Sequence, residues 1–192
     1  MAAQTKNDHN VLIVSSYDKF TASVMRVLSG RGYRTIEAKK SASTARREIL
    51  EKSYDIVLIN TPLSDETGVE LGIDISDSSS TGVIIAAPGE SSEDVAERVT
   101  DHGIIVVAKP ATGRLLLRNV RLIGALLDKL KGAQKKVLTL EEKMEEIRLV
   151  NRAKWILIER DGMSEDEAHR YINKQAMDRC VSKKEIAGEI IG

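Results

Sequence analysis

Residues 150–180 concentrate side chains that could hold a nucleic acid. They include cations that can neutralise phosphates, amides that can hydrogen-bond to base edges, and two aromatic rings on which bases can stack. Looped RNA is recognised by these contacts used together. For two of the residues another role stays open: Lys154 as a solvated surface residue, and Trp155 as a packing or partner contact. The candidate set is Arg152, Lys154, Trp155, Tyr171, Asn173, Lys174, Gln175 and Arg179.

Three short helices are expected to position this set. Asp161-Gly162 predicts the end of the first helix, because glycine favours a left-handed exit from a helix. Ser164 followed by Glu167 forms a capping box that begins the second helix, and Ser182 is expected to cap the third. The residues expected to face inward are Ala168, Ile172, Ala176, Ile186, Ile190 and Ile191.

This tail resembles the ANTAR domain of transcription antiterminators over residues 147–191. The resemblance implies a small helical bundle that binds paired RNA hairpins in nascent transcripts and keeps a terminator from forming. Trp155 stands where the family usually has a small residue, and Asn173-Lys174 stands at a basic pair, so one positive charge is missing. The matching positions are Ala153-Lys154, Ile156-Leu157-Ile158, Gly162, Ser164-Glu165, Ala168 and Ala176-Met177.

Residues 121–147 carry an apolar heptad repeat of the kind found in coiled coils. An exposed apolar stripe of this length is unfavourable in water unless another helix covers it, so we expect a homodimer. Packing of the helix against its own domain is the alternative. The repeat ends at Asn151 and Lys154, where the apolar face shifts. The repeat has Ile123, Leu130, Val137 and Met144 at position a, and Leu126, Ala133, Leu140 and Ile147 at position d.

The first half of the chain alternates apolar runs with amphipathic stretches. Continuous β-branched runs are typical of parallel strands buried on both faces. The pattern predicts a doubly wound, parallel five-stranded sheet of flavodoxin-like order, with its functional groups at the carboxyl ends of the strands. The expected strands are 11–14, 34–38, 56–59, 83–87 and 104–107, and the expected helices include 19–28, 42–50 and 93–100.

This half resembles the receiver domain of bacterial response regulators across residues 10–125. Receivers are phosphorylated on an aspartate after the third strand, beside a magnesium-binding acidic pair, a hydroxyl residue and a lysine. Serine hydroxyls are poor magnesium ligands, and an asparagine amide cannot form an acyl phosphate. We therefore predict a pseudo-receiver. The corresponding positions here are Ser15, Ser16, Asn60, Ala86 and Lys109.

Three residues near these positions need an interpretation. Lys109 is a relic, a structural donor to Asn60, or part of another ligand site. Asp18 and Asp65 are carboxylates that lie further along the chain, without the companions that phosphorylation requires. The resemblance also implies a cis bond between Lys109 and Pro110.

Composition limits the class of protein. A chain of 192 residues has room for about two small domains. One cysteine, Cys180, excludes an internal disulfide framework, and no apolar run approaches the ~18 residues of a membrane helix, so we expect a cytoplasmic location. Residues 1–110 hold 12 Lys+Arg against 16 Asp+Glu, and the remaining residues hold 17 against 13, an asymmetry that favours a nucleic-acid partner for the second half.

The sequence shows neither a catalytic cluster nor a cofactor motif. His9, His102 and His169 lie far apart without metal-ligand spacing, so we expect no metal, no cofactor and no enzymatic activity. The predicted organisation is a disordered N-terminus (1–9), a pseudo-receiver (10–120), a coiled-coil helix (121–147) and a three-helix all-α ANTAR domain (148–192).

These patterns together indicate a dimeric antiterminator that binds tandem RNA hairpins, with a regulatory protein as a further partner. Two alternatives stay open. One is a two-component regulator controlled by phosphorylation. The other is a coiled-coil scaffold or sequestering protein that does not bind RNA.

Overall fold

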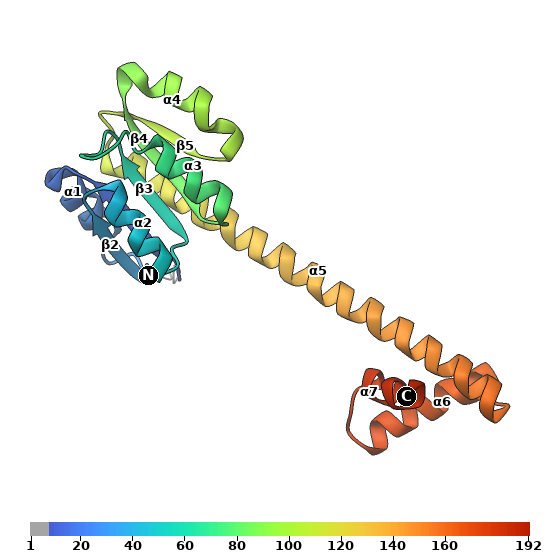
Figure 1. Ribbon diagram of the computed structural model, residues 1–192. Coiled ribbons are helices and arrows are strands. Elements are labelled where there is room, and N and C mark those ends of the chain that lie inside the picture. The colour runs from blue at the N-terminus through green and yellow to red at the C-terminus, as the bar shows by residue number, and fades with distance from the viewer. Residues whose placement is uncertain (1–7) are drawn as a thin grey trace. The chain divides into compact units, whose positions relative to one another are not determined.

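The computed structural model describes residues 8–192, which divide into two compact units after Leu130 (Figure 1). The first unit contains β1 (Asn10–Ser15), α1 (Asp18–Leu28), β2 (Thr35–Lys39), α2 (Ala42–Glu51), β3 (Ile56–Asn60), α3 (Val69–Ser78), β4 (Gly82–Pro88), η1 (Gly89–Ser91), α4 (Ser92–Val99), η2 (Thr100–His102), β5 (Ile105–Lys109) and the start of α5 (Gly113–Asp161). The second unit contains the rest of α5, α6 (Glu165–Asp178) and α7 (Lys183–Ile191). No helix of the described residues is long and apolar enough to cross a membrane.

The five strands form one parallel sheet in the order β2-β1-β3-β4-β5, which confirms the predicted doubly wound, flavodoxin-like fold. All five residues of β3 are buried, as are most of β1 and β4. Because these central strands are covered on both faces, they carry apolar residues at most positions, many of them β-branched, and show no polar alternation.

Each face of the sheet has its own core, since successive side chains of a strand point to opposite faces. Leu12, Val57 and Ile85 lie in the core that α2, α3 and α4 cover. The opposite core contains the neighbours of these residues along the strands and is covered by α1 and α5; its strand residues are Val11, Ile13, Ile56, Leu58, Ile84 and Val107.

The first turns of α5 belong to this second core. Leu117, Val120 and Ile123 are buried there, together with Leu127. Gly82 makes the close approach possible, because a Cβ at that position would overlap the Ile123 side chain. Ile123 therefore packs inside its own unit, and its prediction as a dimer contact is wrong: the heptad pattern identifies an apolar face but does not say what covers it.

Two further features differ from the sequence-based expectations. α3 is a helix that the sequence patterns did not indicate. The predicted disordered segment 1–9 lies mostly in residues 1–7, outside the described part, but His9 is buried. Its carbonyl accepts a hydrogen bond from the Arg34 amide at 3.0 Å, and its ring lies 3.4 Å from the Asp128 carboxylate of α5.

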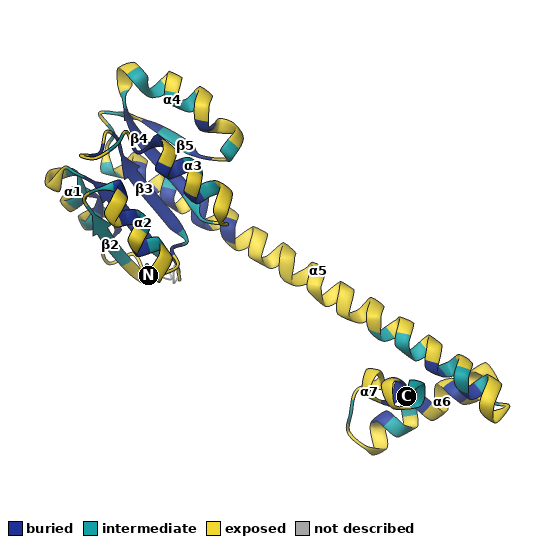
Figure 2. Ribbon diagram, viewed as in Figure 1, coloured by how far each residue is buried: buried dark blue, intermediate teal, exposed yellow. Residues whose placement is uncertain are grey.

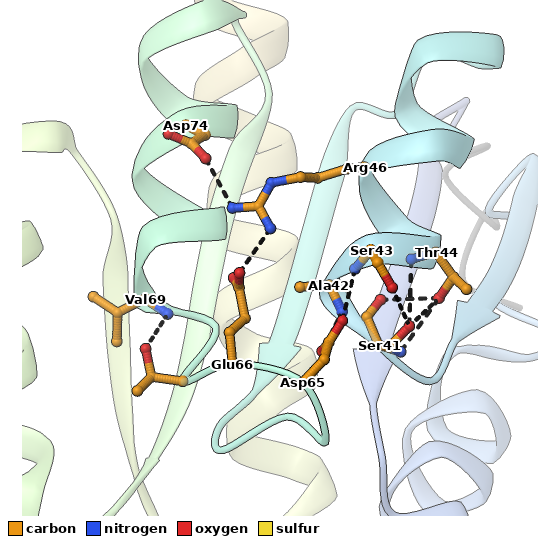
Figure 3. A network of polar contacts seen from close by, with 10 residues as sticks. Ser41, Ala42, Ser43, Thr44, Arg46, Asp65, Glu66, Val69 and Asp74 are labelled. Carbon is orange, nitrogen blue, oxygen red and sulfur yellow. Dashed lines mark hydrogen bonds and ion pairs between the residues drawn. The ribbon is translucent and has the colours of Figure 1, made fainter.

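The loop between β3 and α3 is tied to α2 by polar contacts, shown in Figure 3. Asp65 accepts hydrogen bonds from the backbone amides of Ala42 at 2.9 Å and Ser43 at 3.0 Å, at the positive end of α2. Arg46 bridges Glu66 and Asp74, with N–O distances of 2.8 and 2.9 Å. The backbone amides of Ser43 and Ala42 stabilise the charged carboxylate of Asp65 and lower its pKa to about 2.

Replacing Gly82 with alanine should destabilise the first unit, because Ile123 must shift to admit the new methyl group. Overpacking of this kind costs about 1–3 kcal/mol in free energy of unfolding. Gly132→Ala is the matched control: it lies in an open part of α5 and should stabilise the helix by up to ~1 kcal/mol. Urea denaturation of both variants measures the difference, and equal effects would contradict the packing of α5 on the sheet.

Asp65→Asn should reduce the pH dependence of stability in acid. A carboxyl whose pKa is lowered on folding stabilises the fold above its ordinary pKa of 3.8, and this contribution is lost as pH falls towards 2. Free energies of unfolding measured between pH 5 and pH 2 should therefore fall more steeply for the wild type than for the variant. Parallel curves would show that Asp65 does not cap α2 in solution.

Candidate nucleic-acid interface and receiver site

The second unit is a three-helix bundle with a small apolar core. Ala153 and Leu157 of α5 pack against the inward faces of α6 and α7, whose buried residues are Ala168, Ile172, Ala176, Ile186 and Ala187. The inward positions predicted for α6 are confirmed, and of those predicted for α7 Ile186 is buried while Ile190 and Ile191 are half-buried. Alanines at the helix crossings allow close approach of the backbones, so a few large side chains fill the core.

The predicted caps hold the helices in place. Gly162 has a φ of 68°, as expected for a left-handed helix exit. Ser164 and Glu167 form the expected capping box: each side chain bonds the backbone amide of the other residue, and the bond to Glu167 Oε2 is 2.8 Å long. Ser182 accepts a hydrogen bond from the Glu185 amide at 3.1 Å and begins α7.

A shallow hollow at the start of α6 brings together two of the predicted RNA-binding residues. Tyr171 is 41% exposed and shares the hollow with Lys174. Arg170, which the sequence analysis did not single out, lines the same hollow. Arg170 and Lys174 are four residues apart on a helix, a spacing that places side chains next to each other. The sequence could therefore have predicted that these two cations lie together. The hollow thus combines one aromatic side chain with two cations, and Asp161 and Glu167 also line it.

Lys154 and Trp155 lie elsewhere on the bundle. The Lys154 ammonium is half-buried and pairs with Glu165 at 2.8 Å, an ion pair that lowers the pKa of Glu165. Trp155 is 64% exposed and lines a separate hollow with Lys154, Asn151 and Ile158. The bundle core therefore does not use the indole.

The remaining predicted residues are dispersed. Arg179 forms a bidentate ion pair with Glu189, with one N–O distance of 2.6 Å, which raises the pKa of the arginine. Arg152 is exposed on α5, Gln175 is half-buried, and Asn173 lines a third hollow near Ser182. The structure does not bring the eight residues into one surface.

A groove on the bundle contains residues that the sequence analysis did not single out. Ile147 and Val150 of α5 supply its apolar part, and Lys143, Lys154, His169 and Lys183 surround them. These residues come from all three helices, so sequence spacing alone could not associate them.

The heptad residues outside the sheet core are exposed. Figure 2 shows the middle of α5 as exposed along its length. Leu140 is 60% exposed, although the side chain is fully apolar. The predicted dimer contacts other than Ile123 are all exposed to solvent in the single chain. They are Leu126, Leu130, Val137, Leu140, Met144 and Ile147.

At the carboxyl end of the sheet, an amide takes the place of the receiver's acceptor carboxylate. Asn60 ends β3 and is buried. Its Nδ2 donates to Ser15 Oγ at 2.9 Å, and its Oδ1 accepts from Lys109 Nζ at 2.9 Å. Lys109 also donates to the Thr61 carbonyl, and burial lowers the pKa of its ammonium. Of the three interpretations of Lys109, the donor to Asn60 is confirmed.

The other receiver positions carry no charge that could hold a magnesium ion. Ser16 Oγ donates to the Lys40 carbonyl at 2.9 Å, and Ala86 is buried beside Asn60 in the sheet register. Asp18 pairs with Lys40 at 2.9 Å, while Asp65 caps α2. Within residues 8–192, no group of three or more His, Cys, Asp or Glu residues is arranged to hold a metal ion. The residues at this end of the sheet do not fit magnesium.

The bond between Lys109 and Pro110 is cis, as expected, and so is the bond between Thr61 and Pro62. Both bonds follow strands at the carboxyl end of the sheet, after β5 and β3.

Comparison with known proteins supports both an ANTAR domain in the second unit and a receiver-like fold in the first. Residues 138–191 match the family model of the ANTAR domain, which starts nine residues before the span indicated by the sequence resemblance. The transcriptional regulatory protein PdtaR of Mycobacterium tuberculosis is 26% identical over 183 residues, 94% of this chain and 88% of that protein.

Solved receiver domains share the fold of the first unit. The signal receiver domain of an HD domain-containing protein from Pseudomonas fluorescens Pf-5 superposes with a TM-score of 0.59 at 21% identity, covering 69% of this chain and 97% of that one. A CheY-like response regulator receiver domain from Methanospirillum hungatei gives 0.58 at 21% identity, with 64% and 98% covered. The chain therefore joins a receiver-like N-terminal domain to an ANTAR domain at residues 138–191.

Proposed function

We propose that this protein is an RNA-binding transcription antiterminator that acts in the cytoplasm as a dimer, without aspartyl phosphorylation and without enzymatic activity. The observation that carries the proposal is an ANTAR domain with an exposed tyrosine that shares a surface hollow with two cations. The similarity to a protein named as a transcriptional regulatory protein supports a regulatory role.

The RNA contact is assigned to the hollow around Tyr171. An unpaired loop base stacks on the phenol ring, while Arg170 and Lys174 neutralise the adjacent phosphates. In our proposal Lys154 and Arg179 contribute less, because each already has a carboxylate partner that a phosphate would have to displace.

The dimer is assigned to the exposed heptad residues of α5. A pair of helices would cover Leu140, Met144 and Ile147, which the single chain leaves in water. Two ANTAR domains in one dimer can bind two adjacent hairpins, and the second contact gains affinity from its high effective concentration. A hairpin held in this way competes with the terminator, and polymerase reads through.

The receiver-like unit is proposed to act without phosphate. Phosphorylation needs a carboxylate nucleophile and a bound magnesium ion, and here Asn60 is engaged with Ser15 and Lys109. Control would then come from a partner protein or from the abundance of the chain.

Tyr171→Ala should weaken binding to tandem hairpins taken from leaders near the gene of this protein. The loss of one stacked base costs about 1–3 kcal/mol, or roughly 5- to 150-fold in affinity. Arg170→Ala combined with Lys174→Ala should reduce the slope of log affinity against log salt by roughly 1.4. Fluorescence anisotropy with labelled RNA measures both effects.

The control for the double variant is Lys19→Ala combined with Arg47→Ala, which removes the same charge from exposed residues of the first unit. This control should bind as the wild type does. If all variants bind equally, the Tyr171 surface is not the RNA site. If the wild type retains no hairpin at moderate salt, the scaffold alternative replaces antitermination.

Incubation with acetyl phosphate and magnesium should add no phosphoryl group to the full chain. Intact mass spectrometry tests this directly, with a phosphorylatable receiver domain as the positive control. A mass increase of one phosphoryl group on an aspartate would support the two-component alternative.

A further inference from the structure

The bundle has an aromatic residue that is more than half exposed, and a groove that is lined in part by apolar residues. Trp155 is 64% exposed on α5. The apolar lining residues of the groove are Ile147 and Val150, and its polar ones are Lys143, Glu146, Asn151, Lys154, His169 and Lys183. Both features lie next to the heptad stripe, since Asn151 follows Met144 at position a and Trp155 follows at position e.

We infer that the groove receives the Trp155 indole of a second copy of this chain, in a parallel dimer whose register Asn151 sets. This inference rests on the dimer of the proposed function. It extends the interface beyond Ile147, where the apolar heptad pattern ends, and it assigns Trp155 to protein contact and not to RNA stacking.

Orientation follows from the charges beside the stripe. In a parallel pair, each g residue faces the next e residue of the partner, and these contacts select orientation. Lys136 at g then faces Glu141 at e, an attractive pair, while Lys143 faces Arg148, an unfavourable one. In an antiparallel pair, g residues face each other. The central g residues are Lys129, Lys136 and Lys143, so a register centred on them brings lysines together without a carboxylate. The parallel arrangement has the smaller electrostatic cost.

The same rule places the indole. Val150 is the next g residue, and it faces Trp155 at e of the second copy. Val150 is half-buried and lines the groove, so an indole that reaches it enters the groove. The lysines that line the groove can lie over the ring face, where cations are attracted to an indole. Two-fold symmetry makes the contact twice, since each chain supplies one groove and one indole.

Asn151 accounts for the polar interruption of the stripe. A single asparagine at position a pairs with its counterpart across a parallel dimer, and so fixes register and limits the assembly to two chains at some cost in stability. Asn151 is exposed in the single chain and lines the groove, so its amide is available for that pairing.

A nucleobase is the other flat group that could enter the groove. The second copy is favoured for two reasons: the Lys154 charge is already neutralised by Glu165 at 2.8 Å, and the groove continues the uncovered stripe through Ile147. An RNA occupant would leave Trp155 without cover.

Trp155 is the only tryptophan in the chain, so its fluorescence reports the contact without labelling. In the wild-type dimer and without RNA, we expect blue-shifted emission and protection from acrylamide. Leu140→Asp, which should separate the chains, should shift the emission to the red and expose the indole. Trp155→Ala should raise the dimer dissociation constant about thirtyfold or more, as for an aromatic hot spot. Leu138→Ala removes an equally exposed apolar side chain outside the stripe and should leave the constant unchanged.

Register is tested by cross-linking in a Cys180→Ser background. Asn151→Cys should form an interchain disulfide under mild oxidation, because a positions meet across the axis. Arg152→Cys, its neighbour on another face of α5, should not.

A Trp155 that stays accessible to acrylamide in a chain shown by sedimentation to be dimeric would overturn the inference and leave the dimer standing.

Two other results would also overturn the inference. Protection of the indole that occurs only after hairpin RNA is added would assign the groove to RNA. A wild-type chain that sediments as a monomer at all concentrations would remove both this inference and the proposed dimer.

Discussion

An apolar stripe on α5 that nothing in residues 131–192 covers is the constraint on which the rest of the second unit depends. Val137, Leu140, Met144 and Ile147 are each more than half exposed. Their burial in a pair of helices would contribute roughly 1.5–3 kcal/mol for each side chain that becomes fully buried. The three-helix bundle beyond them is small, and its core contains four alanines among seven buried residues. In the proposed dimer, a second copy of α5 would add the buried apolar area that an ANTAR domain of this size lacks by itself.

The same helix has a different role at its start. Leu117, Val120, Ile123 and Leu127 pack in the core against the sheet, and Gly82 gives Ile123 the room it needs. One helix thus packs on its own unit first and presents free apolar surface later. α5 is therefore one continuous helix that belongs to both units.

In the receiver-like unit, hydrogen bonds among Ser15, Asn60 and Lys109 occupy the carboxyl end of the sheet. Ser15, Asn60 and Lys109 satisfy one another, so burial leaves few polar atoms without a partner at this end of the sheet. The acidic residues that sequence inspection finds nearby serve structure: Asp65 caps α2, and Asp18 pairs with Lys40.

The sequence by itself determined most of the elements and their order. Continuous β-branched runs indicated buried parallel strands, and Ser164, Glu167 and Gly162 marked helix ends, because strand burial and capping act over a few neighbouring residues. α3 escaped notice because its short run of Gly, Asp and Ser residues has weak helical preference.

Only the tertiary structure decided which side chains meet. It placed Ile123 under the sheet, grouped Arg170 with Tyr171 and Lys174, engaged Arg179 with Glu189, and assembled the groove from three helices. Periodicity identifies the face of a helix on which a residue lies. What that face contacts depends on how the helices cross, and the crossing is set by packing between residues far apart in the chain.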